Sequence, residues 1–411
     1  MISENEFDVI IVGAGPGGSS AALYLTKAGK KVLLLDKATF PRDKICGDAL
    51  SGKTIGILRE LGLEEQIKKT KHGMVNGITL SSPKGEVMKL PFSKEGRQVR
   101  VQGYVVRRHD ADFVFFSAAK KAATKTIEGF TVTDIILEDS FVKGVKGKGS
   151  DGKEMEFRAP VTIGADGAYS VVARRLAIVK HPDEHMCAAT RAYFDNVEGL
   201  NDTIEIHFIK DLMPGYFWVF PIDGKNANVG LGMVVKDLKK KGYNLQEKTL
   251  EVIKNHPMFK ERFKDSKLVG NVMSWQLPFG SKHQQLHGNG YVLIGDAAAL
   301  VDPFSGEGVG NALLSGKIAA DVISRGIDNK NVSAEVLAEY KDKLWATVDH
   351  ELQTSYNMQK MGRNQFILNL VIHKAATKPK VRDAIVGMLE NDEAKKDLVT
   401  PLGLLKLMFF N

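Results

Sequence analysis

Apolar positions near the start of the chain predict a strand, a helix and a second strand. Residues 8–12 are mostly apolar and β-branched, as a strand buried on both faces requires. The segment that follows is rich in alanine and leucine and has the composition of a helix. The run Leu33-Leu34-Leu35 predicts the second strand. The chain is therefore expected to open with a βαβ unit of a parallel sheet.

The pattern changes twice further along the chain. The expected elements are, in order, helices over 52–70, short strands over 76–106 around the turn cluster 81–85, a helix over 111–126, hairpin-like segments as far as residue 157, a buried strand over 161–163, antiparallel strands over 188–235, a further buried strand over 291–294, and mostly helix after Val332. This order predicts an α/β layer that is interrupted by an antiparallel sheet.

The glycines between the first strand and helix indicate a dinucleotide site. Gly13 permits a tight turn, Gly15 lets the backbone approach a pyrophosphate, and Gly18 lets the helix pack closely. The amides at the start of the helix would point at the phosphates. Asp36 ends the second strand, where a ribose would lie. These residues alone do not say which dinucleotide binds.

Composition narrows the class of protein. The 411 residues carry a net charge of +8, but the basic residues are scattered and no nucleic-acid-binding signature accompanies them, so we expect no nucleic-acid partner. Cys46 and Cys187 are too few for a disulfide framework, which favours a reducing cytoplasm. The first strand begins within a few residues of Met1, so we expect no signal peptide. No apolar run reaches the roughly twenty residues that span a bilayer.

Two histidine pairs resemble parts of zinc sites but lack the full pattern. His181 and His185, like His283 and His287, are four residues apart, yet neither pair has the His-Glu-x-x-His arrangement. We therefore expect no metal site.

Two distant Gly-Asp elements resemble motifs of the flavoprotein hydroxylase superfamily. They are the segment Gly164-Ala165-Asp166-Gly167 with the residues to Arg175, and Gly295-Asp296-Ala297-Ala298 with the loop Asp302 to Ala312. The resemblance implies FAD as the cofactor, with Asp166 near the pyrophosphate and Asp296 on the ribityl chain. The helix that opens after Gly308 would direct its dipole at the flavin pyrimidine, where reduced flavin is negatively charged.

A basic segment adds a further likeness. Residues 104–112 resemble the Val-x-Arg-x-x-Phe-Asp segment of the superfamily, so Arg108 matches its cofactor-side arginine, although Ala111 stands where the family usually has phenylalanine. Arg107 is the competing candidate. The expected cofactor-binding residues are Gly13, Gly15, Gly18, Asp36, Lys37, Arg42, Cys46, Gly47, Arg108, Asp166, Gly295, Asp296, Gly306, Gly308, Val309 and Gly310.

Three shorter segments resemble the geranylgeranyl reductase family of FAD-dependent oxidoreductases. They are residues 40–51, which contain Cys46-Gly47-Asp48, residues 214–221, which read Pro-Gly-Tyr-Phe-Trp-Val-Phe-Pro, and residues 229–232. The Tyr-x-Trp-x-Phe-Pro pattern is that family's substrate-wall signature. Flavin-dependent halogenases carry Trp-x-Trp-x-Ile-Pro at this place, from which the chain departs at two of four positions.

This resemblance implies a reductase that saturates C=C bonds of a geranylgeranyl or other polyprenyl chain on a lipid. Tyr216 and Trp218 are two residues apart on a strand and would project to one side as an aromatic wall. Cys46 would be a proton donor, a positioning group or a buried small side chain. In the same loop, Arg42 and Lys44 would meet a phosphate, while solvated surface charge is the expected state of Lys44. The alternative activity is that of a monooxygenase or halogenase acting on an aromatic substrate.

The fold expected from these features is a Rossmann-like FAD-binding domain interrupted by an antiparallel substrate sheet. The expected boundaries are 1–75, 104–185 and 285–332 for the FAD-binding domain, 76–103 and 186–284 for the substrate sheet, and 333–411 for a helical C-terminal region. Electrons would come from NAD(P)H or a ferredoxin-like protein. The apolar tail from Pro401 to Asn411 would either pack on the protein or lie at the inner face of a membrane, giving a cytoplasmic protein with peripheral membrane contact.

Overall fold

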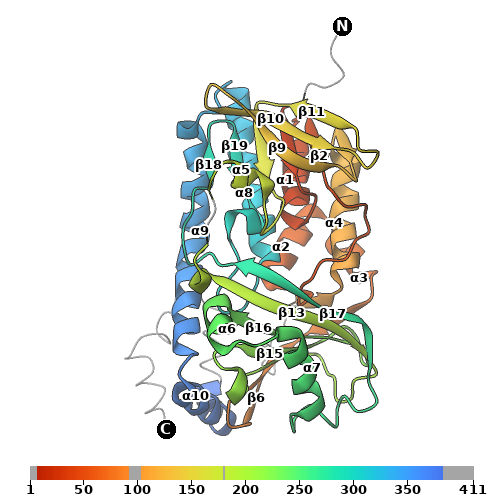
Figure 1. Cartoon of the computed structure of the whole chain (residues 1–411), viewed down its shortest axis with the longest axis vertical. Helices are drawn as coiled ribbons and strands as arrows, with labels where there is room; N and C mark the ends of the chain where they lie inside the picture. Colours follow the sequence, from red (N-terminus) through yellow and green to blue (C-terminus); the bar gives the residue numbers. More distant parts are fainter. Residues whose placement is uncertain (1–6, 92–102, 179–180, 383–411) are drawn as a thin grey trace.

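The computed structural model describes residues 7–91, 103–178 and 181–382. The molecule is elongated, with strands and helices of a parallel layer at one end and a large curved sheet at the other (Figure 1). The parallel sheet has the spatial order β18 (His287–Gly288), β19 (Tyr291–Leu293), β12 (Val161–Gly164), β1 (Val9–Val12), β2 (Val32–Leu35) and β8 (Lys125–Ile127). Its strands run parallel except β18, which is antiparallel to β19.

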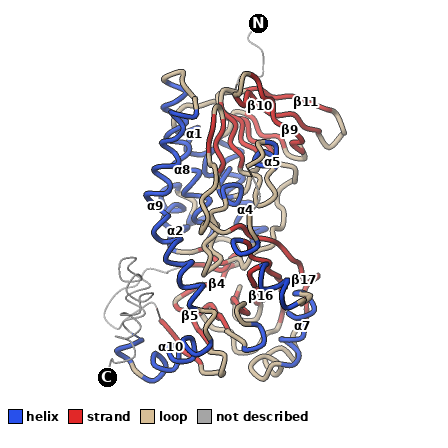
Figure 2. Tube along the Cα trace, turned by 60° about the vertical axis from the view of Figure 1, so that its left-hand side comes forward, coloured by secondary structure: helices blue, strands red, loops and turns tan. Residues whose placement is uncertain are grey.

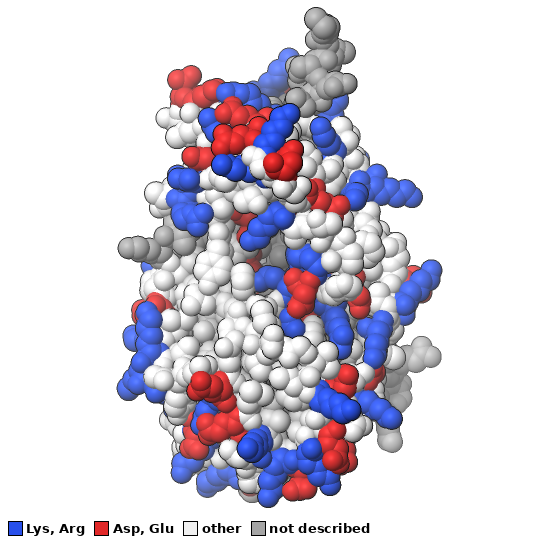
Figure 3. All heavy atoms as spheres, turned by 45° about the vertical axis from the view of Figure 1, so that its right-hand side comes forward, with Lys and Arg blue, Asp and Glu red and all other residues white. Residues whose placement is uncertain are grey.

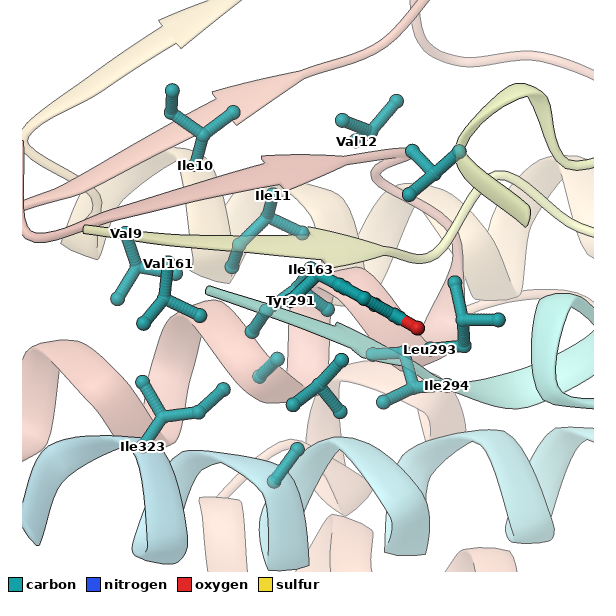
Figure 4. Packing of buried hydrophobic residues seen from close by; sticks show 14 of the residues in the cluster. Val9, Ile10, Ile11, Val12, Val161, Ile163, Tyr291, Leu293, Ile294 and Ile323 are labelled. Carbon is teal, nitrogen blue, oxygen red and sulfur yellow. The ribbon is translucent and has the colours of Figure 1, made fainter. Parts of the chain in front are cut away.

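Both faces of the parallel sheet are covered. Helices α1 (Pro16–Lys27) and α8 (Val309–Asp328) pack together on one face. A three-stranded sheet, called here the crossover sheet, covers the other face. It consists of β11 (Glu154–Arg158), β10 (Phe141–Lys148) and β9 (Thr131–Glu138). In Figure 4, Ile11 and Ile163 point from their strands toward α8, which presents Ile323, whereas Ile10 points to the opposite face. Because neither face meets water, the strand residues are apolar without alternation.

The large sheet forms the other end of the molecule. Its order is β17 (Lys267–Pro278), β13 (Met186–Asp195), β16 (Ala227–Val234), β15 (Tyr216–Pro221), β14 (Thr203–His207), β5 (Gly77–Ser81) and β6 (Val87–Pro91). Neighbouring strands are antiparallel except β14 and β5. Helix α7 (Leu245–Asn255) packs on its outer face with α6 (Val235–Lys241) at its border. The inner face of this large sheet packs against the segments that connect it to the parallel layer.

A small sheet and three helices join the two ends. The sheet contains β3 (Ala49–Leu50), β7 (Gly103–Val106) and β4 (His72–Val75), and the helices are α2 (Gly52–Leu61), α3 (Glu64–Lys68) and α4 (Arg108–Ala122). Val75 and Val105 of this sheet pack against Trp218 and Phe220 on the inner face of the large sheet. The loop from β2 to β3, which contains Cys46, is thereby held between the two ends.

The described part of the C-terminal region, residues 333–382, is mostly helical, as expected. Helix α9 (Ala334–Met361) runs lengthwise from the parallel layer to the large sheet (Figure 2). Helix α10 (Gln365–Thr377) packs beside β6. The remaining short helices are α5 (Val171–Arg175) and the 3-10 turns Asp183–His185, Lys210–Leu212 and Gly295–Ala298. Among the described residues, no helix has the length and apolar character needed to cross a membrane. The tail from Pro401 lies outside the described residues.

The predicted α/β class is confirmed, and one local prediction was wrong. The helix expected over 111–126 is α4, which begins at Arg108 and ends at Ala122. Residues 125–127 instead form β8, because this short segment pairs with β2 and becomes the edge strand of the parallel sheet. Residues 52–70, which were expected to be helical, contain α2 and α3, and Gly62 ends α2 with a φ of 71°. The domain boundaries stay a prediction.

Candidate active site

The glycine-rich turn lies directly against the first Gly-Asp element. Gly13 has a φ of 102°, and a side chain there would overlap the carbonyl oxygen of Ala165. A side chain at Gly18 would overlap the carbonyl oxygen of Gly13, so α1 can begin close beneath the turn only with glycine. The carboxylate of Asp36 accepts hydrogen bonds from the backbone N–H groups of Ala14 and Ala38, at 2.7 and 2.8 Å. Lys37, which follows Asp36, is exposed.

Asp166 caps a helix with its carboxylate. Oδ1 accepts from the Ser170 hydroxyl at 2.6 Å, and Oδ2 accepts from the Val171 N–H at 2.6 Å. Burial raises the pKa of this carboxyl, and the hydrogen bonds oppose that shift. Its backbone therefore meets the glycine-rich turn while its side chain holds the start of α5.

The second Gly-Asp element lies at the start of α8. Gly295 has a φ of 59°, and Asp296 lies beside Gly308, which precedes the helix. Glu307, which we did not single out from the sequence, accepts a hydrogen bond from the N–H of Gly310 at 2.6 Å. Burial raises the pKa of Glu307, and Lys53 opposes that shift. One backbone donor at this helix end is thus already capped by the chain itself.

Arg108 belongs to a buried cluster with one carboxylate and two arginines. Its guanidinium makes a two-pronged contact with Asp112, at 2.5 and 2.8 Å, and Arg42 reaches the same carboxylate at 2.8 Å. Burial alone would raise the pKa of Asp112, but the two arginines hold it below its usual range. Arg42 also lies beside Gly15 of the glycine-rich turn. Arg107 lies apart from this cluster, with its guanidinium over the Tyr193 ring at 4.5 Å.

The expectation that Lys44 is a solvated surface charge was wrong. Its ammonium nitrogen is shielded from solvent, has no hydrogen-bond partner among the described residues, and lies 3.6 Å above the Trp275 ring. Burial lowers its pKa to about 8, and the carboxylate of Asp296 opposes that shift. The loop folds inward because its neighbours Asp43 and Asp48 are bound by Arg191 and Tyr193 of the large sheet.

This unpaired ammonium tests whether the site suits FAD. A buried cation without a hydrogen-bonded partner costs several kcal/mol, about 3–5 when a pair is broken, so an anion bound nearby would stabilise it. FAD carries such charge on its phosphates and, when reduced, on the flavin. Lys44, Arg42 and Arg108 would offer it positive charge beside the glycine-rich turn. The residues present therefore fit FAD. Figure 3 shows a hollow between the two ends of the molecule with lysine and arginine atoms at its rim.

Three aromatic side chains form a wall on the inner face of the large sheet. The rings of Tyr216 and Trp218 are 6.1 Å apart between centroids, as are those of Trp218 and Phe220. Glycines of β16 provide the room, because a side chain at Gly230 would overlap the Trp218 ring. The wall meets two of the expected cofactor-binding glycines: Gly47 lies against Trp218 and Phe220, and Gly306 lies against the hydroxyl of Tyr216.

Tyr216 keeps its proton in this environment. Its hydroxyl donates to the carbonyl oxygen of Ser305, at 3.3 Å. Burial raises the pKa of the phenol, and the nearby side chains of Cys187 and Asp302 raise it further. Burial also raises the pKa of the Cys187 thiol to about 12, so this cysteine is an inert neighbour of the wall.

A buried polar network connects the wall with the Cys46 loop. Asn228 of β16 accepts from the Trp218 indole N–H at 3.0 Å and donates to the Cys46 carbonyl oxygen and the Asp48 carboxylate, each at 2.8 Å. Tyr193 also donates to Asp48, at 2.7 Å. Asp48, Tyr193 and Asn228 escaped sequence reasoning because no local pattern distinguishes them from ordinary turn and strand residues. The signal available was the position of Asp48 directly after Cys46-Gly47.

The buried carboxyl of Asp48 should make the stability of the fold depend on pH. Burial raises its pKa to about 6 in the folded chain, whereas an unfolded aspartate titrates near pH 4. The folded state therefore binds more protons between these values, so the free energy of unfolding falls as pH rises from about 4 to 6. Asp48→Asn should remove this slope, so the variant should gain about 3 kcal/mol relative to the parent across that range. Urea unfolding from pH 4 to 8 measures this, and equal slopes in both proteins would contradict it.

The chain matches known flavoproteins over most of its length. A family model described as an FAD binding domain matches residues 6–314. A digeranylgeranylglycerophospholipid reductase of Methanococcoides burtonii is 30% identical over 359 residues, covering 86% of this chain and 83% of that one. A menaquinone reductase of Mycobacterium tuberculosis is 30% identical over 328 residues, covering 79% and 78%. A geranylgeranyl bacteriochlorophyll reductase-like structure from Thermoplasma acidophilum superposes with a TM-score of 0.83 at 24% identity, covering 96% of this chain and 98% of that one.

These matches confirm FAD as the cofactor and an oxidoreductase as the class of enzyme. The roles assigned to individual residues stay predictions. The chain belongs to the geranylgeranyl reductase family of FAD-dependent flavoproteins.

Proposed function

We propose that the protein saturates C=C bonds of a geranylgeranyl or other polyprenyl chain carried by a lipid. The observation that carries this proposal is the contact of the aromatic wall with Gly47 and Gly306, because it brings an apolar surface against the proposed cofactor residues. The reductases named among its relatives support the same chemistry. A prenyl chain is apolar and would find in Tyr216, Trp218 and Phe220 a surface that excludes water.

The side chains of the site suit a double bond with no neighbouring carbonyl group. Reduced FAD supplies a hydride when bound. As one carbon of the double bond takes up a proton, positive charge develops on the other carbon, which accepts the hydride, and the π faces of Tyr216 and Trp218 would stabilise such charge. The first carbon therefore needs a proton donor. Cys46 is the proposed donor, since its thiol lies beside the Arg108 guanidinium in the loop next to Gly47.

The cofactor would be held by residues from both Gly-Asp elements and the first turn. We propose that Gly13, Gly15 and Gly18 meet the pyrophosphate, with Arg42 and Arg108 at their side. Asp36 and Lys37 would border the adenosine half. Asp296 and the turn Gly306 to Gly310 would border the flavin.

The same proposal names the substrate, the electron donor and the membrane contact of the enzyme. The substrate would be a prenyl lipid, the electron donor NAD(P)H or a ferredoxin-like protein, and the enzyme would contact the inner face of a membrane. The boundaries 1–75, 104–185 and 285–332 for the FAD-binding domain are part of the same proposal. They assign the parallel sheet and its crossover to cofactor binding and the large sheet to substrate binding.

Turnover without oxygen tests the proposed reaction. The FAD-loaded protein, reduced with dithionite and mixed with a geranylgeranyl phospholipid, should yield products heavier by two mass units for each saturated bond, measured by mass spectrometry. A hydroxylated or halogenated aromatic product, formed only with oxygen, would instead identify a monooxygenase or halogenase. A reduced flavin that never reoxidises with any prenyl acceptor would identify a binding protein without this chemistry.

Cys46→Ala should lower kcat at least about tenfold, because general-acid catalysis contributes factors of this size or more. FAD content, measured by absorbance, should be unchanged. Cys187→Ala is the matched control, since Cys187 neighbours the wall but its thiol does not ionise near neutral pH. If Cys46→Ala reoxidises reduced flavin with prenyl lipid at the parental rate in stopped flow, Cys46 has no part in the reaction.

A further inference from the structure

Asn228 occupies the junction between the two proposed catalytic elements. It is fully buried on β16, opposite Tyr193 of β13 and Phe220 of β15. Its side-chain carbonyl oxygen accepts a hydrogen bond from the indole N–H of Trp218. Its amide nitrogen donates to the Cys46 carbonyl oxygen and to the Asp48 carboxylate. One side chain thus bridges the wall and the Cys46 loop.

The chemistry of an asparagine side chain suits this junction. The amide offers an acceptor at one end and two donors at the other. Trp218 can only donate through its indole, while the Cys46 carbonyl and the Asp48 carboxylate accept. Leucine would satisfy none of these groups, and an ionised carboxylate would satisfy only the indole. The paired strands on both sides fix the backbone, so the amide has little freedom to move.

We infer that Asn228 is a positioning residue, which sets the separation between the Trp218 ring and the Cys46-Gly47 segment and so the space for a prenyl double bond. This inference rests on the proposed function. The ring and the segment lie close together, since a Cβ atom added at Gly47 would lie 3.8 Å from the Trp218 indole nitrogen. Without Asn228, the indole N–H and Asp48 would lose partners in a buried place, and loop and wall would separate to recover them.

Asn228→Leu and Asn228→Asp give different pH signatures. Asn228→Leu should lower kcat about tenfold at every pH, with KM changed less than threefold. In Asn228→Asp the introduced carboxyl faces Asp48. The other titratable or charged groups around Asp48 are Cys46 in the same loop, Tyr193 and Arg191 on β13, and Arg108 on α4. When ionised it repels Asp48, and when protonated it can donate as the amide does. Its kcat relative to the parent should therefore recover as pH falls from 8 to 6.

Asn226→Asp is the matched control. Asn226 donates to Asp223 at 2.7 Å in the turn between β15 and β16, so the change again places a carboxyl against an aspartate, but outside the site. Its kcat should follow the parental pH profile. Circular dichroism and FAD absorbance at each pH confirm that every variant is folded and loaded. A constant ratio of Asn228→Asp to parent across pH would overturn the inference.

Alkylation of Cys46 provides a readout that needs no turnover. N-ethylmaleimide should label Cys46 at least about threefold faster in Asn228→Leu, because the loop is no longer tied to β16. Mass spectrometry of peptides gives the rate, and Cys187, whose buried thiol does not ionise near neutral pH, should stay unlabelled in parent and variant. An unchanged Cys46 rate would overturn the inference. Absence of prenyl reduction by the parent protein would overturn the proposed function alone, and labelling would still decide whether Asn228 holds the loop.

Discussion

Replacing Asp112 by alanine should destabilise the fold by about 3–5 kcal/mol, because it leaves two cations without their shared carboxylate. Asp112 is buried and contacts both Arg108 and Arg42, and Arg108 is itself buried. Since Arg42 lies beside Gly15, the same change should weaken FAD binding. Urea unfolding of the FAD-free protein measures the first effect, and titration with FAD measures the second.

A neighbouring acid on the same helix provides the control. Asp110 contacts the half-exposed His109, so Asp110→Asn should change stability by less than about 1 kcal/mol. Asp112→Asn keeps an acceptor for the arginines and should fall between the two. The explanation fails if Asp112→Ala unfolds within 1 kcal/mol of the parent.

Gly230→Ala should abolish reduction of prenyl lipid, with a loss of about a hundredfold or more, since small displacements at a site have effects of this size. The added methyl group would overlap both the Trp218 ring and the carbonyl oxygen of Thr190. The ring must turn away from the wall, and β16 must move from β13. Turnover and thermal unfolding of the same preparation separate the effect on the wall from the effect on stability.

Substitutions at two other glycines serve as controls for this effect. At Gly232 a methyl group would meet ordinary contacts, the nearest being the Cys187 sulfur at 3.7 Å, so Gly232→Ala should retain most activity. At Gly224, in the turn before β16, nothing lies within 4 Å, so Gly224→Ala should behave as the parent. If Gly230→Ala retains parental turnover, the aromatic wall does not define the substrate site.

Local sequence was informative where burial is uniform or where glycine is required. Residues 9–12 could be recognised as a strand because both faces are buried, and Gly13 because only glycine tolerates its contact with Ala165. Residues 125–127 could not, since they become a strand only through pairing with β2. Short segments of this kind take their structure from their neighbours, which their own sequence does not contain.

The site was predictable in its motifs but not in its connections. Tyr216 and Trp218 were identified by spacing and resemblance, and they do share one face of β15. Lys44 was misplaced because charge predicts solvent exposure, whereas here Asp43 and Asp48 on either side bind the large sheet and draw the loop inward. Asn228 could not be found, because its three partners lie on two other segments, β15 and the Cys46 loop, that only the folded chain brings together with β16.

The spatial order of the parallel sheet affects how the protein folds during its synthesis on the ribosome. β1 leaves the exit tunnel early, but its neighbour β12 follows only after α4 and the crossover sheet, and β19 only after the whole large sheet. At about 5–20 residues per second, the first strand waits several seconds or more for these neighbours. Until then β1 has only β2 beside it, and its other edge stays unpaired, which invites aggregation during that interval. A nascent chain of this enzyme should therefore depend on chaperones more than its modest size suggests.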